Sequence, residues 1–216
     1  AILSGLALNE KGLERGLACG VELFCLGASA SETHSMKNTG MGTEESTRRI
    51  IGAAKAAVAA GKKVQVSVQS AFGCGFEGAI PEERVLNMVR AYLQAGLRNI
   101  SLADTAGHAH TAKVERLFGA VLRLDPAIEC TCHFHNTYGL GMANMYAAMR
   151  AGVTAFETSF AGLGGCPFTK VAAGNVATED FVHALRLEGL RKDVDLDKLI
   201  ALARGVAGHF GREMQG

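Results

Sequence analysis

Helix-like segments of this chain repeatedly end in a small residue and a glycine, and a β-rich run begins directly afterwards. The junction occurs at Gly20, Gly61, Gly96 and Gly152. Glycine suits the position just past a helix end because it adopts the left-handed conformation without Cβ strain. Helices and strands that alternate in this way predict a parallel sheet with helices packed on it.

Six strands are predicted along the chain. They are expected at about 2–8, 21–27, 63–69, 98–103, 128–135 and 153–160. Between them, segments such as 48–60 and 84–95 carry apolar residues at helical spacing. Thr43, Pro81 and Thr178 mark helix starts, because each precedes two acidic residues that suit the first turn of a helix.

The sheet is predicted to belong to a barrel rather than to an open sheet. Open sheets that bind nucleotides usually carry a glycine-rich loop after the first strand, and segment 6–16, LALNEKGLERG, has no such fingerprint. Polar residues follow several strands instead, as at the carboxyl-terminal rim of a barrel. We therefore predict one α/β domain over residues 1–216, a partial (β/α)8 TIM barrel with six of its eight strands.

The composition argues against several classes of partner. A net charge of +1 gives no electrostatic reason to bind nucleic acid or an anionic membrane. No apolar run is long enough to span a bilayer, and the first residues do not form a signal peptide. The 6 cysteines are interpreted as reduced thiols, because a chain with 48% hydrophobic residues fills a core without disulfides. We therefore expect a reducing compartment such as the cytoplasm.

Two histidines, His133 and His135, lie two positions apart at the end of a predicted strand. Alternate residues of a strand share one face, so both imidazoles point the same way. They are either a pair of metal ligands or simply polar residues that line a barrel mouth. Cys130 and Cys132 are predicted to face the helix layer and to pack there, since CxC is shorter than the usual zinc spacing.

A glycine-rich loop carries the next candidate. Gly162, Gly164 and Gly165 precede Cys166, which is either a proton donor, a nucleophile or an ordinary loop thiol. Asn175, just before a predicted helix, has three possible roles: a cap, a turn residue or a metal ligand.

Asp104 follows the strand NISLA at the same predicted rim. An acid there either orients a histidine that binds metal or caps the next helix. No role is assigned to Cys74 and Glu77 in another rim loop. Surface or packing roles are expected for His34, His108, His110, His183 and His209.

Several segments resemble one known family, the 3-hydroxy-3-methylglutaryl-CoA (HMG-CoA) lyases. Segment 161–185, AGLGGCPFTKVAAGNVATEDFVHAL, resembles their cysteine-loop signature, and 133–144, HFHNTYGLGMAN, resembles their two-histidine strand. Supporting matches are SAFGCGFEG, NISLADTAG and GASASETHSMKN. The resemblance runs over essentially the whole chain, and the cysteine-loop block is highly specific.

The resemblance implies cleavage of HMG-CoA to acetyl-CoA and acetoacetate, a retro-Claisen reaction of leucine degradation and ketone body metabolism. It implies that His133, His135 and Asn175 ligate Mg²⁺ or Mn²⁺. It also implies that Cys166 is the general acid–base and that Asp104 supports the metal site. A homodimer and an acyl-CoA substrate are expected.

The same resemblance gives supporting or substrate-binding roles to Asn38, Glu179, Gly164 and Gly165. In the family, an Arg-Asp-Gly motif on the first strand and a Glu on the second complete the site, and neither is present here. We therefore expect the first two strand–helix units to be missing, so that the six strands correspond to the third to the eighth.

Two further departures from the family pattern keep other functions open. Asn136 stands where the family often has Asp, and Ser67 stands where it often has a Tyr near the substrate. A related acyl-CoA with a different branch is therefore one alternative. The others are a condensing enzyme of the isopropylmalate or homocitrate synthase type and an inactive fragment or paralogue.

Overall fold

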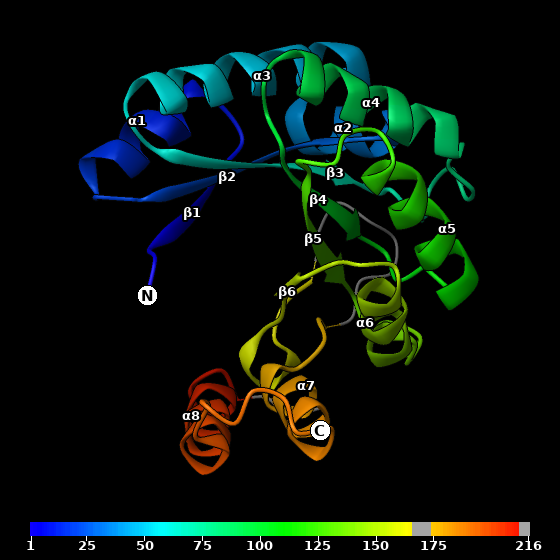
Figure 1. Ribbon diagram of the computed structural model, residues 1–216. Helices are drawn as coiled ribbons and strands as arrows, with labels where there is room; N and C mark the ends of the chain where they lie inside the picture. Colours follow the sequence, from blue (N-terminus) through cyan, green and yellow to red (C-terminus); the bar gives the residue numbers. More distant parts are fainter. Residues whose placement is uncertain (166–173, 212–216) are drawn as a thin grey trace.

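Six parallel strands form one curved sheet in the computed structural model, which describes residues 1–165 and 174–211. The strands are β1 (Ser4–Ala7), β2 (Leu23–Ser29), β3 (Lys63–Gln69), β4 (Asn99–Asp104), β5 (Glu129–Phe134) and β6 (Ala155–Glu157). Their spatial order follows the sequence order from β1 to β6. Figure 1 shows the sheet as an open arc, so the described part of the chain is an α/β half-barrel.

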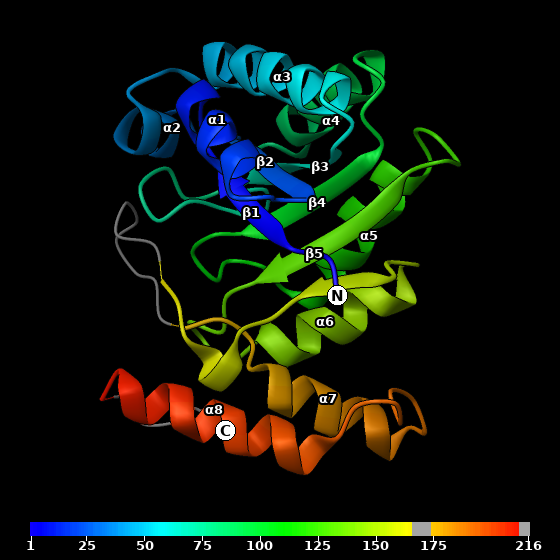
Figure 2. The ribbon, with the colours of Figure 1, turned by 90° about the vertical axis from the view of Figure 1, so that its left-hand side faces the viewer.

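Helices cover the convex side of this arc (Figure 1). The helices of the strand–helix units are α1 (Glu10–Ala18), α2 (Glu32–Thr39), α3 (Thr43–Ala59), α4 (Glu82–Gln94), α5 (Thr111–Leu122) and α6 (Gly141–Arg150). A 3₁₀ turn, η1 (Phe160–Gly162), follows β6 and precedes α7 (Thr178–Leu187) and α8 (Leu196–His209). Figure 2 shows α7 and α8 lying side by side below the sheet.

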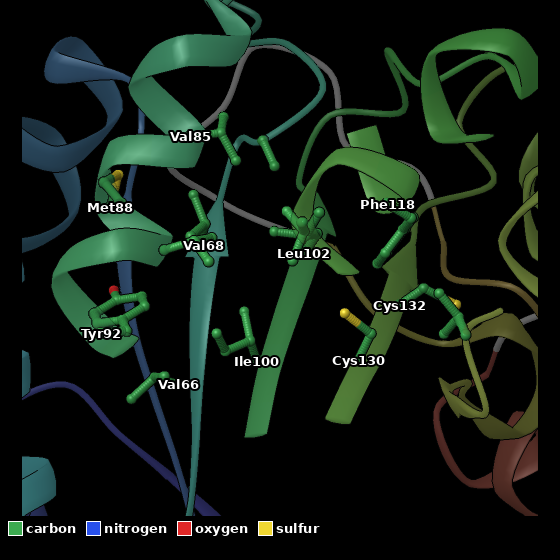
Figure 3. Close-up of a cluster of buried hydrophobic side chains, with 14 of the residues drawn as sticks. Val66, Val68, Val85, Met88, Tyr92, Ile100, Leu102, Phe118, Cys130 and Cys132 are labelled. Atoms are coloured by element: carbon green, nitrogen blue, oxygen red, sulfur yellow. The ribbon is translucent and has the colours of Figure 1, made fainter. Parts of the chain in front are cut away.

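The hydrophobic core lies between the strands and the outer helices. Alternate residues of the central strands point into it, among them Val66 and Val68 of β3 and Ile100 and Leu102 of β4 (Figure 3). Phe118 of α5 packs among them and is fully buried. Burying a side chain of this size stabilises the fold by about 1.5–3 kcal/mol, so these alternating positions hold the helices against the sheet.

The predicted orientation of the two cysteines of β5 is confirmed. Cys130 and Cys132 belong to the same core as the outer helices (Figure 3), and the Cys132 sulfur lies 3.6 Å from the Met145 sulfur of α6. Burial raises the pKa of the Cys130 thiol to about 12. At neutral pH that thiol is protonated and acts as an apolar side chain.

The first five strands begin and end within two residues of their predicted bounds. The strand predicted at 153–160 is regular only over Ala155–Glu157. The chain then bends into η1, where Ala161 adopts a positive φ of 56°. Among the described residues, no helix is both long and apolar enough to cross a membrane.

Candidate active site

A cavity of about 320 Å³ lies on the concave side of the sheet. Its polar lining includes Asn38, Gln65, Ser67, Ser101, His133, His135 and Glu157, and Gly165 lies at its margin. The residues come from several strand–helix units, because the carboxyl ends of parallel strands meet at one rim. Four predicted site residues, His133, His135, Asn38 and Gly165, therefore share one cavity.

His133 and His135 lie on the same face of the chain, as the alternation predicted. Their ring centroids are 5.2 Å apart with an interplanar angle of 75°. Phe134, between them, points the other way and stacks with Phe72 and Phe118 in the core. The apolar side of β5 thus fixes the backbone from which both imidazoles enter the cavity.

Main-chain hydrogen bonds bring Asn175 beside His135. The two residues form an antiparallel β-bridge, and the Asn136 N–H donates to the Gly174 carbonyl at 2.9 Å. The Asn175 side-chain Nδ2 donates to the Leu163 carbonyl at 2.9 Å. Its Oδ1 is buried and accepts no hydrogen bond from any described residue. A buried acceptor without a donor is costly, so this oxygen is suited to a cation.

The three donors fit a divalent metal as an incomplete set. Two imidazoles and one amide oxygen suit Mn²⁺ or Mg²⁺ when water or carboxylate oxygens complete the shell. Within residues 1–165 and 174–211, no three His, Cys, Asp or Glu side chains cluster closely enough to hold a metal. Asn175 is not among these side chains, because asparagine is not one of those four residue types. Cys166 is not among them either, because it lies outside the described residues.

Gly164 packs directly against the Asn175 amide. Its φ is +135°, and a Cβ at this position would overlap the Asn175 Nδ2. Only glycine satisfies both the backbone conformation and the close approach. Gly164 would therefore support the site by leaving room for the amide of Asn175, a proposed metal ligand.

Gly164→Ala is expected to weaken Mn²⁺ binding by at least ~10-fold, because it displaces a proposed ligand. Gly139→Ala is the matched control, since Gly139 also has a positive φ of 75° but no atom near its added Cβ. Gly139→Ala should lose on the order of 1 kcal/mol of unfolding free energy in urea, and Gly164→Ala should lose more because its Cβ also overlaps the Asn175 amide. Equal Mn²⁺ affinities for the two variants would contradict the assignment.

Glu179 binds the backbone at the start of the glycine-rich loop. It is buried in the first turn of α7, and both of its carboxylate oxygens accept from the Ala161 N–H, at 2.9 and 3.2 Å. Ala161 has the positive φ noted above, so this carboxylate stabilises a backbone conformation that alanine rarely adopts. The structure thus places Glu179 at the base of the loop rather than in the lining of the cavity.

Asp104 binds the backbone of the loop before α5. Its two oxygens accept from the backbone N–H groups of His108 and Ala109, at 2.8 and 3.0 Å. Burial raises the pKa of the Asp104 carboxyl, while these two backbone hydrogen bonds act in the opposite direction. These two contacts order the loop before α5 and do not cap the helix, which begins at Thr111 without a side-chain cap. A role for Asp104 in orienting a histidine stays a prediction.

Sequence reasoning missed two residues of the cavity. His34, expected to be a surface or packing residue, is buried and lines the cavity, and burial lowers its pKa. Glu157 lies opposite His133 in the pairing of β5 with β6. The alternation of β6 is a signal that would have found Glu157, since it places this lone acid on the inner face.

Comparison with known proteins agrees with this geometry. The HMGL-like family model matches residues 1–206. The hydroxymethylglutaryl-CoA lyase of Bacillus subtilis is 36% identical over 98% of this chain and 71% of its own length. The 3-hydroxy-3-isohexenylglutaryl-CoA/hydroxymethylglutaryl-CoA lyase of Pseudomonas aeruginosa is 34% identical over 97% of this chain and 70% of its own length.

Among solved structures, an HMG-CoA lyase from Acinetobacter baumannii in complex with coenzyme A and 3-methylmalate superposes with a TM-score of 0.93. It is 37% identical and is matched over 100% of this chain and 70% of that one. The human mitochondrial lyase is 36% identical over 90% of this chain and 60% of its own length. The chain therefore spans well under the full length of these relatives.

The strand order and the polar rim define an α/β protein of the TIM-barrel class. Its relatives and structural neighbours are HMG-CoA lyases, which are oxo-acid lyases. The chain belongs to the HMGL-like family.

Proposed function

We propose that this chain carries the metal-binding and proton-transfer part of a lyase that cleaves HMG-CoA, or a close acyl-CoA relative, to acetyl-CoA and acetoacetate. The observation that carries the proposal is the buried Asn175 Oδ1 without a donor, beside two imidazoles on one strand. The lyase relatives over nearly the whole chain support the same reaction.

His133, His135 and Asn175 would hold Mg²⁺ or Mn²⁺. When bound, a divalent cation supplies Lewis acidity that lowers the pKa of the tertiary hydroxyl of the substrate. The chain would supply this cation with two nitrogen donors, His133 on β5 and His135 directly after it, and with the side-chain oxygen of Asn175, whose backbone pairs with His135. Donors held on regular backbone keep their spacing without further ordering, which favours binding.

As the C2–C3 bond breaks, the tertiary hydroxyl would lose its proton to water and its C–O bond would become the carbonyl of acetoacetate. Cys166 would donate a proton to C2 of the departing acetyl group. A thiol whose pKa is near 8.5 is suitable for this step close to neutral pH. Gly164 and Gly165 precede it, and Gly165 lies at the margin of the cavity. Glu179 would keep the entry of this loop in place and so help to exclude water.

An acyl-CoA partner is supported by the neighbour that was solved with coenzyme A. The acyl branch depends on the wall of the cavity, where Ser67 and Asn38 lie. Ser67 is a small side chain there, and the Pseudomonas aeruginosa relative is named for a longer branch as well as for methyl. The proposed substrate class is therefore a 3-hydroxy-3-alkylglutaryl-CoA, with HMG-CoA as the first member to test.

We propose further that two strand–helix units outside this chain complete the barrel and supply an arginine and an aspartate. Two observations support this. The chain spans 70% of the length of its structural neighbour, and Leu6 of the edge strand β1 is 69% exposed. A homodimer and a cytoplasmic or mitochondrial matrix location remain proposals from the family resemblance.

The test is an assay of acetoacetate release from HMG-CoA by the full-length protein with Mn²⁺ or Mg²⁺. We expect cleavage that stops on addition of EDTA and returns with excess metal. Cleavage that is indifferent to EDTA would contradict the role of the metal. If metal-loaded protein releases nothing, the reaction is wrong, and condensation of an acyl-CoA with a 2-oxo acid becomes the next assay.

A further inference from the structure

A single carboxylate reaches the cavity from the described residues. Of the side chains that line it, Glu157 is the acidic one. It ends β6 and is the register partner of His133 on β5, so the two side chains project to the same face from adjacent strands. The backbone pairing, and not a loop, therefore sets their proximity.

Glu157 lies against one nitrogen of His133. Its Oε2 is 3.1 Å from the His133 Nδ1, and its Oε1 is 3.5 Å from the Ser101 hydroxyl on β4. The Nδ1 makes no fully aligned hydrogen bond within the described part of the chain, and Glu157 is the acceptor within reach. In unliganded sites such contacts are often poorly aligned and tighten when ligand binds.

Two other titratable groups near the cavity, Asp104 and Cys25, are less suited than Glu157 to accept a hydrogen bond from His133. The carboxylate of Asp104 accepts two backbone hydrogen bonds from the loop before α5. Cys25, also in the cavity lining, has its thiol pKa raised to about 11 by burial and by the nearby charge of Glu157. The thiol is therefore protonated near neutral pH and does not compete as a metal ligand.

We propose that Glu157 is a positioning residue that accepts a hydrogen bond from the His133 Nδ1–H and thereby leaves Nε2 as the nitrogen that binds metal. A carboxylate behind a ligating histidine fixes its tautomer and raises its basicity. The sequence suggested this role for Asp104, for which it stays a prediction; the carboxylate oxygen 3.1 Å from the His133 Nδ1 belongs to Glu157. The inference rests on the proposed function, in which His133 is a metal ligand.

The first measurement is Mn²⁺ affinity in full-length, substrate-free protein, followed by the electron paramagnetic resonance signal of the free ion. Glu157→Ala should weaken binding by about 10–100-fold. Glu157→Gln should weaken it less, because its amide oxygen still accepts from Nδ1–H. Glu129→Gln is the control, since this exposed carboxylate begins β5 at the far end of the strand and should leave affinity unchanged.

The second measurement is the tautomer of His133 from ¹⁵N chemical shifts in metal-free protein near pH 8. Wild type and Glu157→Gln should show the Nδ1–H form, whereas Glu157→Ala should shift towards the Nε2–H form. A merely structural residue would not move this equilibrium. Circular dichroism establishes that each variant is folded.

The outcomes separate the two proposals. If wild type binds Mn²⁺ and Glu157→Ala binds it equally with an unchanged tautomer, the role of Glu157 is overturned while the metal site stands. If wild type binds no Mn²⁺, the metal site and the role of Glu157 both fail. Loss of affinity with a shifted tautomer, rescued in part by glutamine, would establish the positioning role.

Discussion

Replacing Cys166 by alanine is expected to lower kcat for HMG-CoA cleavage by about 10²–10⁴-fold, the usual contribution of a positioned general acid. The carbanion at C2 would then have to take its proton from water. Mn²⁺ affinity should be unchanged, because the thiol is not among the proposed ligands. The measurements are steady-state acetoacetate release and Mn²⁺ titration of the same preparation.

Cys19→Ala is the matched control for this experiment, because Cys19 is an exposed free thiol at the end of α1, away from the cavity. It should retain full activity. Cys166→Ser should lower kcat about as much as Cys166→Ala, since the serine hydroxyl has a much higher pKa than a thiol and is a poor acid near pH 7. Wild-type turnover by Cys166→Ala would refute the assignment, even if the reaction itself is right.

Removal of His135 is expected to have the other large effect. Loss of a residue that supports a metal ligand weakens metal binding by roughly 10–100-fold. His135→Ala removes a proposed ligand itself, so it should weaken Mn²⁺ binding by more than this. Cleavage should fall in parallel at fixed metal and recover partly at high Mn²⁺. Mn²⁺ titration and the metal dependence of kcat check this prediction.

His110→Ala provides the control for His135→Ala. His110 is exposed before α5, and its side chain makes no capping hydrogen bond. It should bind Mn²⁺ as wild type does. Because His135 is only 6% exposed, urea unfolding must show that the alanine variant is folded under assay conditions. Undiminished Mn²⁺ affinity in a folded His135→Ala protein would remove this histidine from the ligand set.

Most of the fold could be predicted from local pattern. The glycines that end the helices and the apolar runs that follow them locate the strands to within a few residues, because helix ends and buried strands have local chemical signatures. The last strand was predicted too long. Soon after this strand ends, the chain bends at Ala161, whose N–H donates to Glu179, and a contact between residues so far apart in sequence has no local signal.

In the site, too, features with a local sequence signal were predicted, and features that depend on contacts distant in sequence were not. The shared face of His133 and His135 follows from the two-residue period of a strand. Whether Asp104 serves a histidine or a loop depends on which atoms its carboxylate reaches, and the structure shows two backbone amides. The alternation of β6 could have placed Glu157 on the inner face, but its position opposite His133 required the register of β5 with β6.

The bridge between His135 and Asn175 has a consequence for how such a site can change during evolution. Backbone pairing places these two positions together, so their separation does not depend on which side chains they carry. A substitution of the amide by a carboxylate or an imidazole would keep the geometry and alter the donor. Since metal preference follows donor type, the metal preference of the proposed site would change with such a substitution while the backbone pairing stayed in place.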